Sequence, residues 1–273
     1  MNFQAQVLQD STIFAQYGQS TFLTICREIF SMKFAGIIAE YDPFHNGHAA
    51  QLAAVRAAGA QCIAVCMSSG AVQRGGVPIL PESVRVRAAL DAGADLVVAL
   101  PAPYACATAE QFAAAGVYLL AALGCDTLAF GAETPDAGAL LDAARLLQCE
   151  EIDDVIRKNL ATGMTYAAAR AEAADTLRPG TGTLLRTPNN ILGIEYCKAI
   201  LAQHTPLTPF ALPRLGAAHG GGAGEHAGTP MASASFLRSL PQPDWEPFVP
   251  ARAAELYGKA AAEGLLLDGA KFE

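Results

Sequence analysis

The sequence predicts an α/β protein in which helices cover a parallel sheet, and three observations support this class. Short apolar runs alternate with helical patterns along the chain. The links between them are mostly short, which favours parallel strands joined by right-handed crossovers. The 273 residues are 52% apolar and 16% charged, which is enough to bury a sizeable core.

The first strand–helix unit has the most unusual sequence. Residues 36–39 form an apolar run typical of a buried strand, and a helical pattern runs from His48 to near Gly59. Between them the chain turns through Asp-Pro-Phe and places His45 and His48 around an Asn-Gly pair. In an α/β protein, a turn that follows a strand is a usual place for a ligand.

Three further strands and two helices follow the same pattern. Gly93 and Gly124 are suited to end the two helices, because glycine accepts a positive φ. Thr108 is suited to cap the start of the second helix. The strands are predicted at 61–67, 94–101 and 126–133, and the helices at 82–93 and 108–124.

The second half of the chain is predicted to be more helical. Helical patterns dominate from Pro135 to about Ala174, and a loop with a helix behind it follows. The remaining elements are a loop and helix at 178–201, a strand at 206–216, a Gly-rich loop at 216–230, a short helix at 231–241 and a partly helical tail at 244–273.

These patterns suggest three regions. A new start, "MKFAGIIAEY", appears at Met32, so residues 1–31 are an N-terminal extension of doubtful relevance. Residues 32–240 form the predicted main domain. Residues 241–273 are the start of a helical C-terminal region that we expect to be incomplete.

Charge and cysteine content argue against several classes of protein. The formal net charge of −8 opposes a globally basic nucleic-acid binder, and we expect no DNA partner. No apolar run approaches the roughly 20 residues of a membrane span. The seven cysteines are scattered and form no CxxC, so we expect reduced thiols, a cytoplasmic location and no metal site.

Unusual segments follow all four of the first predicted strands. Because the carboxyl ends of parallel strands meet at one edge of a sheet, we expect these segments to converge on one active site. The segments are 41–48, 68–81, 101–108 and 131–134.

The first of these segments, His45-Asn46-Gly47-His48, suits a phosphate. The N–H groups and the dipole of a helix N-terminus favour negative charge, and Gly47 lets a ligand approach the backbone. Imidazoles at His45 and His48 can donate hydrogen bonds to a phosphoryl transition state. The plainer alternative is a helix-capping turn that carries two surface histidines.

A second candidate is "SASFLR", residues 233–238, in which small hydroxyl residues open a helix and Arg238 follows one turn later. Arg238 would supply the point of charge for a second phosphate contact. A plain helix N-cap explains this segment equally well when it is considered alone.

Together these motifs resemble the HxGH nucleotidyltransferases, and among them the tRNA(Met) cytidine acetate ligase family. The motifs run in order along nearly all of the chain after Met32, and "EYDPFHNGH", "QRG" and "PNNILGIEY" are far more specific together than HxGH alone. The resemblance implies a Rossmann-like parallel sheet with helical additions. It also implies activation of acetate by ATP, with Mg²⁺ accompanying ATP, and acetylation of the wobble cytidine of elongator tRNA(Met).

The resemblance also implies site residues. His45 and His48 are expected to contact the phosphates as catalytic residues, with Arg238 in support. Gln73 and Arg74 are candidates to close over acetate or cytidine. The expected ATP-binding residues are Ile38, Ala39, Glu40, Tyr41, Asp42, Pro43, Phe44, His45, Asn46, Gly47, His48, Ala49, Ala50, Gln51, Gly131, Asn189, Asn190 and Arg214.

This chain departs from the family pattern at several positions, and two other interpretations stay open. Asp42 stands where the family usually has asparagine, and Glu82-Ser83 where it commonly has Lys-Trp. One alternative is a related nucleotidyltransferase that adenylylates a small phosphorylated metabolite. The other is a non-catalytic nucleotide- or RNA-binding relative, or an inactive fragment.

Overall fold

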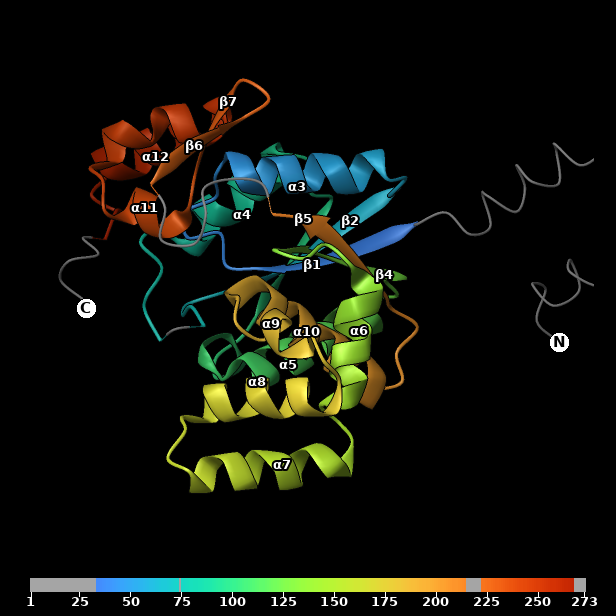
Figure 1. Cartoon of the computed structure of the whole chain (residues 1–273). Coiled ribbons are helices and arrows are strands. Elements are labelled where there is room, and N and C mark those ends of the chain that lie inside the picture. Colours follow the sequence, from blue (N-terminus) through green and yellow to red (C-terminus); the bar gives the residue numbers. More distant parts are fainter. Residues whose placement is uncertain (1–32, 74, 215–221, 268–273) are drawn as a thin grey trace, which may run out of the picture.

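The computed structural model describes residues 33–73, 75–214 and 222–267, and it has the predicted α/β class. Five parallel strands form one sheet in the order β3-β2-β1-β4-β5 (Figure 1). Their bounds are β1 Phe34–Ala39, β2 Cys62–Ser68, β3 Leu96–Leu100, β4 Thr127–Ala132 and β5 Thr208–Pro213.

The order in which the strands are added to the sheet changes direction between β1 and β4. Chain order runs outward from β1 through β2 to β3 on one side, and from β4 to β5 on the other. Ala35 pairs with Thr127 across this boundary, and Ile37 pairs with Val65 on the other side of β1. In open parallel sheets the crevice at such a reversal is the usual ligand site.

Helices cover both faces of the sheet (Figure 1). On one side lie α3 and α4, and on the other lie α5, α6 and α10, with α7 and α8 further out. Their bounds are α3 Asn46–Ala57, α4 Glu82–Asp91, α5 Ala109–Ala122, α6 Ala137–Leu146, α7 Glu150–Ala161, α8 Tyr166–Leu177, α9 Thr181–Leu184 and α10 Pro188–Ala202, with a 3₁₀ turn at Tyr104–Cys106.

The central strands β1, β2 and β4 are mostly buried on both faces, and alternate side chains point in opposite directions. Ile37 of β1 belongs to the hydrophobic cluster under α3 and α4, which includes Leu52. Its neighbour Ile38 belongs to the opposite cluster, with Phe112 of α5 and Ile194 of α10. The continuous apolar runs in the sequence therefore indicated strands covered on both sides.

The predicted helix boundaries of α5 are confirmed in detail. The Thr108 hydroxyl accepts a hydrogen bond from the Gln111 N–H at 3.4 Å. Gly124 follows the last turn of this helix with a φ of 84°, and Gly93 follows α4 with a φ of 108°. Both glycines adopt the left-handed conformation that disfavours other residues.

The prediction of a Gly-rich loop at 216–230 is wrong for its second half. Two short antiparallel strands, β6 Ala223–His226 and β7 Thr229–Ala232, form a hairpin there. Ala227 and Gly228 both have positive φ, which matches the tight turn that a two-residue hairpin needs. Residues 215–221 lie outside the described part of the chain.

The C-terminal elements lie beside the first turn of α3 (Figure 1). They are α11 Ala234–Arg238, a 3₁₀ helix at Gln242–Phe248 and α12 Ala251–Ala262. Trp245 is 2% exposed and Tyr257 is fully buried, and both belong to the cluster that contains α3 and α4. The assignment of 241–273 to a separate region stays a prediction. Among the described residues, no helix has the length and apolar character needed to cross a bilayer.

Candidate active site

A cleft of about 1470 Å³ opens at the carboxyl ends of the parallel strands. Its walls come from the β1–α3 turn, the loop after β2, the end of β4 with the start of α10, and the end of β5 with α11. Three of the four predicted segments therefore contribute to the cleft. Residues 101–108 do not line it, although α5, which follows them, contributes Ala109 and Phe112.

Most of the residues predicted from the sequence line this cleft, but six do not. Those that line it are Ile38, Ala39, Glu40, Tyr41, Asp42, His45, Gly47, His48, Gln51, Gly131, Asn189, Arg214 and Arg238, together with Gln73. Those that do not are Pro43, Phe44, Asn46, Ala49, Ala50 and Asn190. Arg74 lies outside the described residues.

The side chains of three of the six lie away from the cleft, and the expectation that these residues bind ATP stays a prediction. Phe44 is completely buried. The amide of Asn46 donates to the main-chain oxygens of Pro230 at 2.9 Å and Pro247 at 3.1 Å. Asn190 is 2% exposed, and its amide oxygen accepts from the Thr134 N–H at 2.9 Å. These side chains hold walls of the cleft together from behind.

The side chains of the two histidines cap the start of α3 by accepting hydrogen bonds from backbone N–H groups. His45 is the N-cap, and its Nδ1 accepts from the Gly47 N–H at 3.1 Å. The Nδ1 of His48 accepts from the His45 N–H at 3.3 Å. The rings stack with centroids 3.7 Å apart. The capping role considered from the sequence is therefore present, but His45 is buried at 9% exposure and does not lie on the surface.

These contacts determine which ring nitrogen carries the proton. An Nδ1 that accepts a hydrogen bond is unprotonated, so each neutral ring keeps its proton on Nε2. Burial, and to a smaller extent the charge of Arg214, lower the pKa of His45 to about 3. Burial, His45 and Arg214 hold the pKa of His48 well below 6.5. The pair therefore carries two neutral Nε2–H donors on residues that line the cleft.

This protonation pattern predicts an acid-dependent loss of stability. Because the folded pKa of His45 lies below its unfolded value of 6.5, its contribution is complete above pH 6.5 and is lost as pH falls towards 3. Each such histidine should lower the free energy of unfolding by about 1.4 kcal/mol per pH unit in that window. Urea unfolding of the wild type and His45→Asn at pH 7, 6 and 5 measures this slope.

His45→Asn is a matched variant because asparagine is a good N-cap and does not titrate. The stability difference between wild type and variant should shift in favour of the variant as the pH falls. A difference that stays constant between pH 7 and 5 would contradict a depressed pKa for His45.

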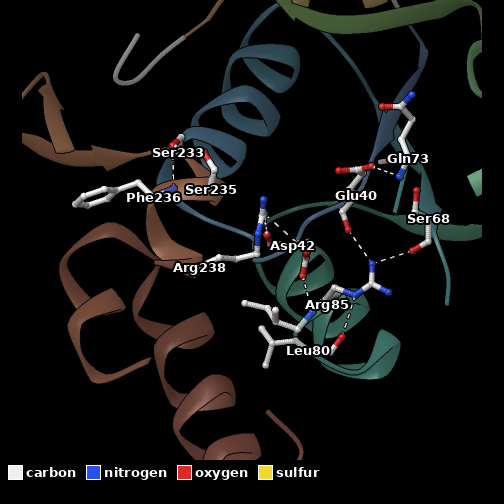
Figure 2. A network of polar contacts seen from close by, with 11 residues as sticks. Glu40, Asp42, Ser68, Gln73, Leu80, Arg85, Ser233, Ser235, Phe236 and Arg238 are labelled. Atoms are coloured by element: carbon white, nitrogen blue, oxygen red, sulfur yellow. Dashed lines mark hydrogen bonds and ion pairs between the residues drawn. The ribbon is translucent and has the colours of Figure 1, made fainter. Parts of the chain in front are cut away.

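On one side of the histidines, α11 brings Arg238 to the cleft. Ser233 caps this short helix, and its hydroxyl accepts from the Phe236 N–H at 3.2 Å (Figure 2). Arg238 Nη1 donates to the main-chain oxygen of Asp42 at 2.6 Å and lies 3.7 Å from Asp42 Oδ2. The N-cap alternative is therefore present, and the same short helix still places an arginine in the cleft.

On the other side, Glu133 organises the start of α10, and sequence reasoning missed this role. Its Oε1 accepts from the Asn189 amide at 2.7 Å, and its Oε2 accepts from the Asn190 N–H at 2.8 Å. Arg214 Nη1 lies 3.9 Å from the same carboxylate. The available signals were the position of Glu133 directly after β4, a strand that ends at the cleft, and the proline at the start of α10.

Hydrogen bonds keep Glu133 ionised. Burial raises the pKa of this carboxyl, but the bonds from the Asn189 side chain and the Asn190 backbone outweigh burial and leave the pKa below 4.5. An ionised carboxylate suits its place at the N-terminus of α10. Glu133 therefore holds two of the predicted site residues, Asn189 and Arg214, in their positions.

Arg85 of α4 lies beneath the cleft and was also missed, because the helix pattern around it is typical of a surface helix. This arginine is 1% exposed. Its guanidinium donates to the main-chain oxygens of Glu40 at 2.7 Å, Ser68 at 2.8 Å and Leu80 at 3.2 Å (Figure 2). It also donates to the main-chain oxygen of Ser69. One side chain thus joins the ends of β1 and β2 to the loop that follows β2.

That loop is also attached to β1 by two carboxylates. Glu40 Oε1 accepts from the Gln73 N–H at 2.6 Å, and Asp42 Oδ1 accepts from the Ile79 N–H at 2.8 Å (Figure 2). The Gln73 amide reaches the main-chain oxygen of Ala107 at 3.2 Å. Gln73 is therefore fixed at the cleft wall from two sides.

Comparison with known proteins shows several that are similar to this chain. The chain is 41% identical over 244 residues to a tRNA(Met) cytidine acetate ligase from Syntrophotalea carbinolica, covering 87% of this chain and 58% of the relative. It is 40% identical over 210 residues to one from Geobacillus sp. strain WCH70, covering 76% and 52%. The chain thus spans little more than half the length of these relatives.

Solved structures show the same likeness. Thermotoga maritima TmcAL bound with alpha-thio ATP superposes with a TM-score of 0.76 at 26% identity, covering 86% of this chain and 57% of that chain. The apo form of TmcAL gives a TM-score of 0.78 at 28% identity, covering 86% and 58%. The family model described as HIGH Nucleotidyl Transferase matches residues 32–269. The likeness expected from the motifs is confirmed, and the chain belongs to the HIGH nucleotidyl transferase family.

Proposed function

We propose that this chain activates acetate with ATP to form acetyl-adenylate, and that the acetyl group then passes to the wobble cytidine of elongator tRNA(Met). One observation carries this proposal: His45 and His48 have two neutral N–H donors and line the same cleft as Arg214 and Arg238. The names of the relatives and the alpha-thio ATP bound by Thermotoga maritima TmcAL support it.

In the first step, an acetate oxygen attacks the α-phosphorus of ATP while the bond to the pyrophosphate oxygen breaks. Negative charge grows on the phosphoryl oxygens at this stage. The Nε2–H groups of His45 and His48 would donate to these oxygens, and Arg238 would stabilise the departing charge. No covalent enzyme intermediate is needed, so catalysis consists of orientation and charge stabilisation.

The nucleoside end of ATP fits the opposite wall. Gly131 at the end of β4 leaves open space, since a Cβ built there meets nothing within 4 Å. Asn189 could pair with a base edge or hydroxyl, and Arg214 could hold a phosphate. In the second step, the exocyclic amine of cytidine attacks the acetyl carbon, AMP leaves and the amine loses a proton. The substrates imply a cytoplasmic location.

Mg²⁺ is proposed as a companion of ATP. The described residues contain no group of three or more His, Cys, Asp or Glu side chains that could hold a metal ion. The triphosphate would therefore supply most of the ligands, as Mg²⁺ commonly keeps water and substrate phosphates in its coordination shell. None of the steps above depends on a protein ligand to the ion.

ATP–pyrophosphate exchange tests the first step directly. Exchange that depends on acetate, measured with and without methionine tRNA, would establish acid activation, and transfer of labelled acetate to tRNA would then establish the acceptor. ATP binding without exchange for any carboxylate would overturn the ligase proposal. Formation of an adenylylated product from a phosphorylated metabolite would favour the related nucleotidyltransferase.

Glu133 offers a prediction for the nucleoside side of the cleft. Glu133→Ala should weaken ATP binding about tenfold, or roughly 1.4 kcal/mol, because Asn189 and Arg214 lose the carboxylate that holds them. Titration calorimetry with ATP measures the effect. Glu133→Gln keeps one acceptor oxygen and should lose less.

Asp136→Ala is a matched control for this experiment. Asp136 also holds the start of a helix, since its carboxylate accepts from the Ala139 N–H at 3.0 Å. Its partner Ala139 does not line the cleft, whereas Asn189 and Arg214, the partners of Glu133, do. Equal ATP affinity in Glu133→Ala and Asp136→Ala would argue against a positioning role for Glu133.

A further inference from the structure

Asp42 contacts two walls of the cleft at once. Its carboxylate is 5% exposed and lies in the β1–α3 turn. Oδ1 accepts from the Ile79 N–H at 2.8 Å, while Arg238 Nη1 approaches Oδ2 at 3.7 Å and the main-chain oxygen at 2.6 Å. Asp42 is therefore the junction between the loop after β2 and α11 (Figure 2).

Among the described residues, Arg238 has protein partners at only one end of its guanidinium. A guanidinium has five N–H donors in a rigid fork. Within the described ranges, only Nη1 of Arg238 has a protein acceptor, and that acceptor belongs to Asp42. The side chain lines the cleft and remains 35% exposed. Its Nη2 and Nε groups can therefore donate to an anion while Asp42 fixes the plane of the fork.

The other contact of Asp42 restrains a wall that faces the same space. Val72, Gln73, Val77 and Ile79 of the loop after β2 line the cleft. The bond from Ile79 to Asp42 ties the far end of this loop to the turn that carries the histidines. A change in the loop would thus be transmitted through Asp42 to Arg238.

Two arginines lie near Asp42 and partly compensate its charge. Burial raises the pKa of this carboxyl above its usual 3.8, and the Ile79 N–H, Arg238 and Arg85 oppose that effect only in part. With two arginines nearby, the carboxylate lies in a cationic environment. A simple repulsion of phosphates by Asp42 is therefore the weaker expectation.

We propose that Asp42 is a positioning residue that orients Arg238 towards the phosphates of the bound nucleotide and couples it to the loop after β2. The proposal rests on the proposed function, because it takes ATP as the ligand of the cleft. Asp42→Asn keeps an acceptor for Ile79 and the main-chain oxygen for Arg238, but it removes the charge that holds the fork.

A double-mutant cycle on ATP affinity tests this role. Asp42→Asn should weaken ATP binding three- to tenfold, and Arg238→Ala should weaken it by more. If Asp42 acts through Arg238, Asp42→Asn should have no further effect in the Arg238→Ala background. A residue that only stabilises the fold would show the same loss in both backgrounds.

The outcomes separate the inference from the proposed function. Calorimetric titration with ATP needs neither acetate nor tRNA, and thermal unfolding of each variant checks that it is folded. Additive losses, or tighter ATP binding by Asp42→Asn, would overturn the positioning role alone. Failure of the folded wild type to bind ATP would overturn both. Should Arg238→Ala unfold, Arg238→Lys replaces it in the cycle, since lysine keeps the charge without the fork.

Discussion

His48→Asn should lower acetate-dependent ATP–pyrophosphate exchange by a factor of about 10² to 10³, which is typical for loss of one hydrogen-bond donor to a developing charge. The asparagine side chain can reproduce the contact of Nδ1 with the His45 N–H, which is 3.3 Å in the wild type. It is too short to reproduce Nε2–H. The variant should therefore fold and bind ATP, but react slowly.

His48→Gln is the matched variant, because its amide nitrogen can lie near the position of Nε2. It should recover part of the rate that His48→Asn loses. If His48→Asn keeps the full rate while remaining folded, the Nε2–H of His48 is not a catalytic donor. Circular dichroism and the ATP dissociation constant of both variants separate a loss of rate from a loss of structure.

Arg85→Met should lower the free energy of unfolding by about 3–5 kcal/mol, because it removes a buried charge-assisted donor. The guanidinium serves the main-chain oxygens of Glu40, Ser68, Ser69 and Leu80. Methionine fills similar space but leaves these acceptors without their shared donor. Urea unfolding monitored by tryptophan fluorescence measures the change.

Arg87→Met provides the control on the same helix. Arg87 is 60% exposed and pairs with Asp91 at 2.8 Å, so its loss should cost at most about 1 kcal/mol. Arg85→Lys should fall between the two, since one ammonium cannot reach all four oxygens. Equal stability of Arg85→Met and Arg87→Met would show that the buried guanidinium contributes little.

Local sequence patterns were sufficient for the five strands of the parallel sheet, the boundaries of α5 and the edge of the sheet where the cleft opens. The signals used were local in the sequence. They were apolar runs long enough for one strand, and helices that begin after threonine or end before glycine. The His45–His48 turn could be placed at the cleft for the same reason, because a turn after a buried parallel strand leads to the carboxyl edge of the sheet. The hairpin at 223–232 was missed because glycine content predicts a turn without indicating whether its flanks pair.

By itself, the sequence determined the α/β class, the edge of the sheet where the cleft opens and a set of site residues of which most line the cleft there. Only the tertiary structure decided which side chains are held in that cleft and by what. Asp42 reaches Arg238 across 196 positions, and Glu133 reaches Asn189 across 56. Such pairs have no local periodicity, because they exist only after the sheet brings distant strand ends to one edge. The burial of Arg85 has the same cause, since its four acceptors belong to segments that meet only in the folded chain.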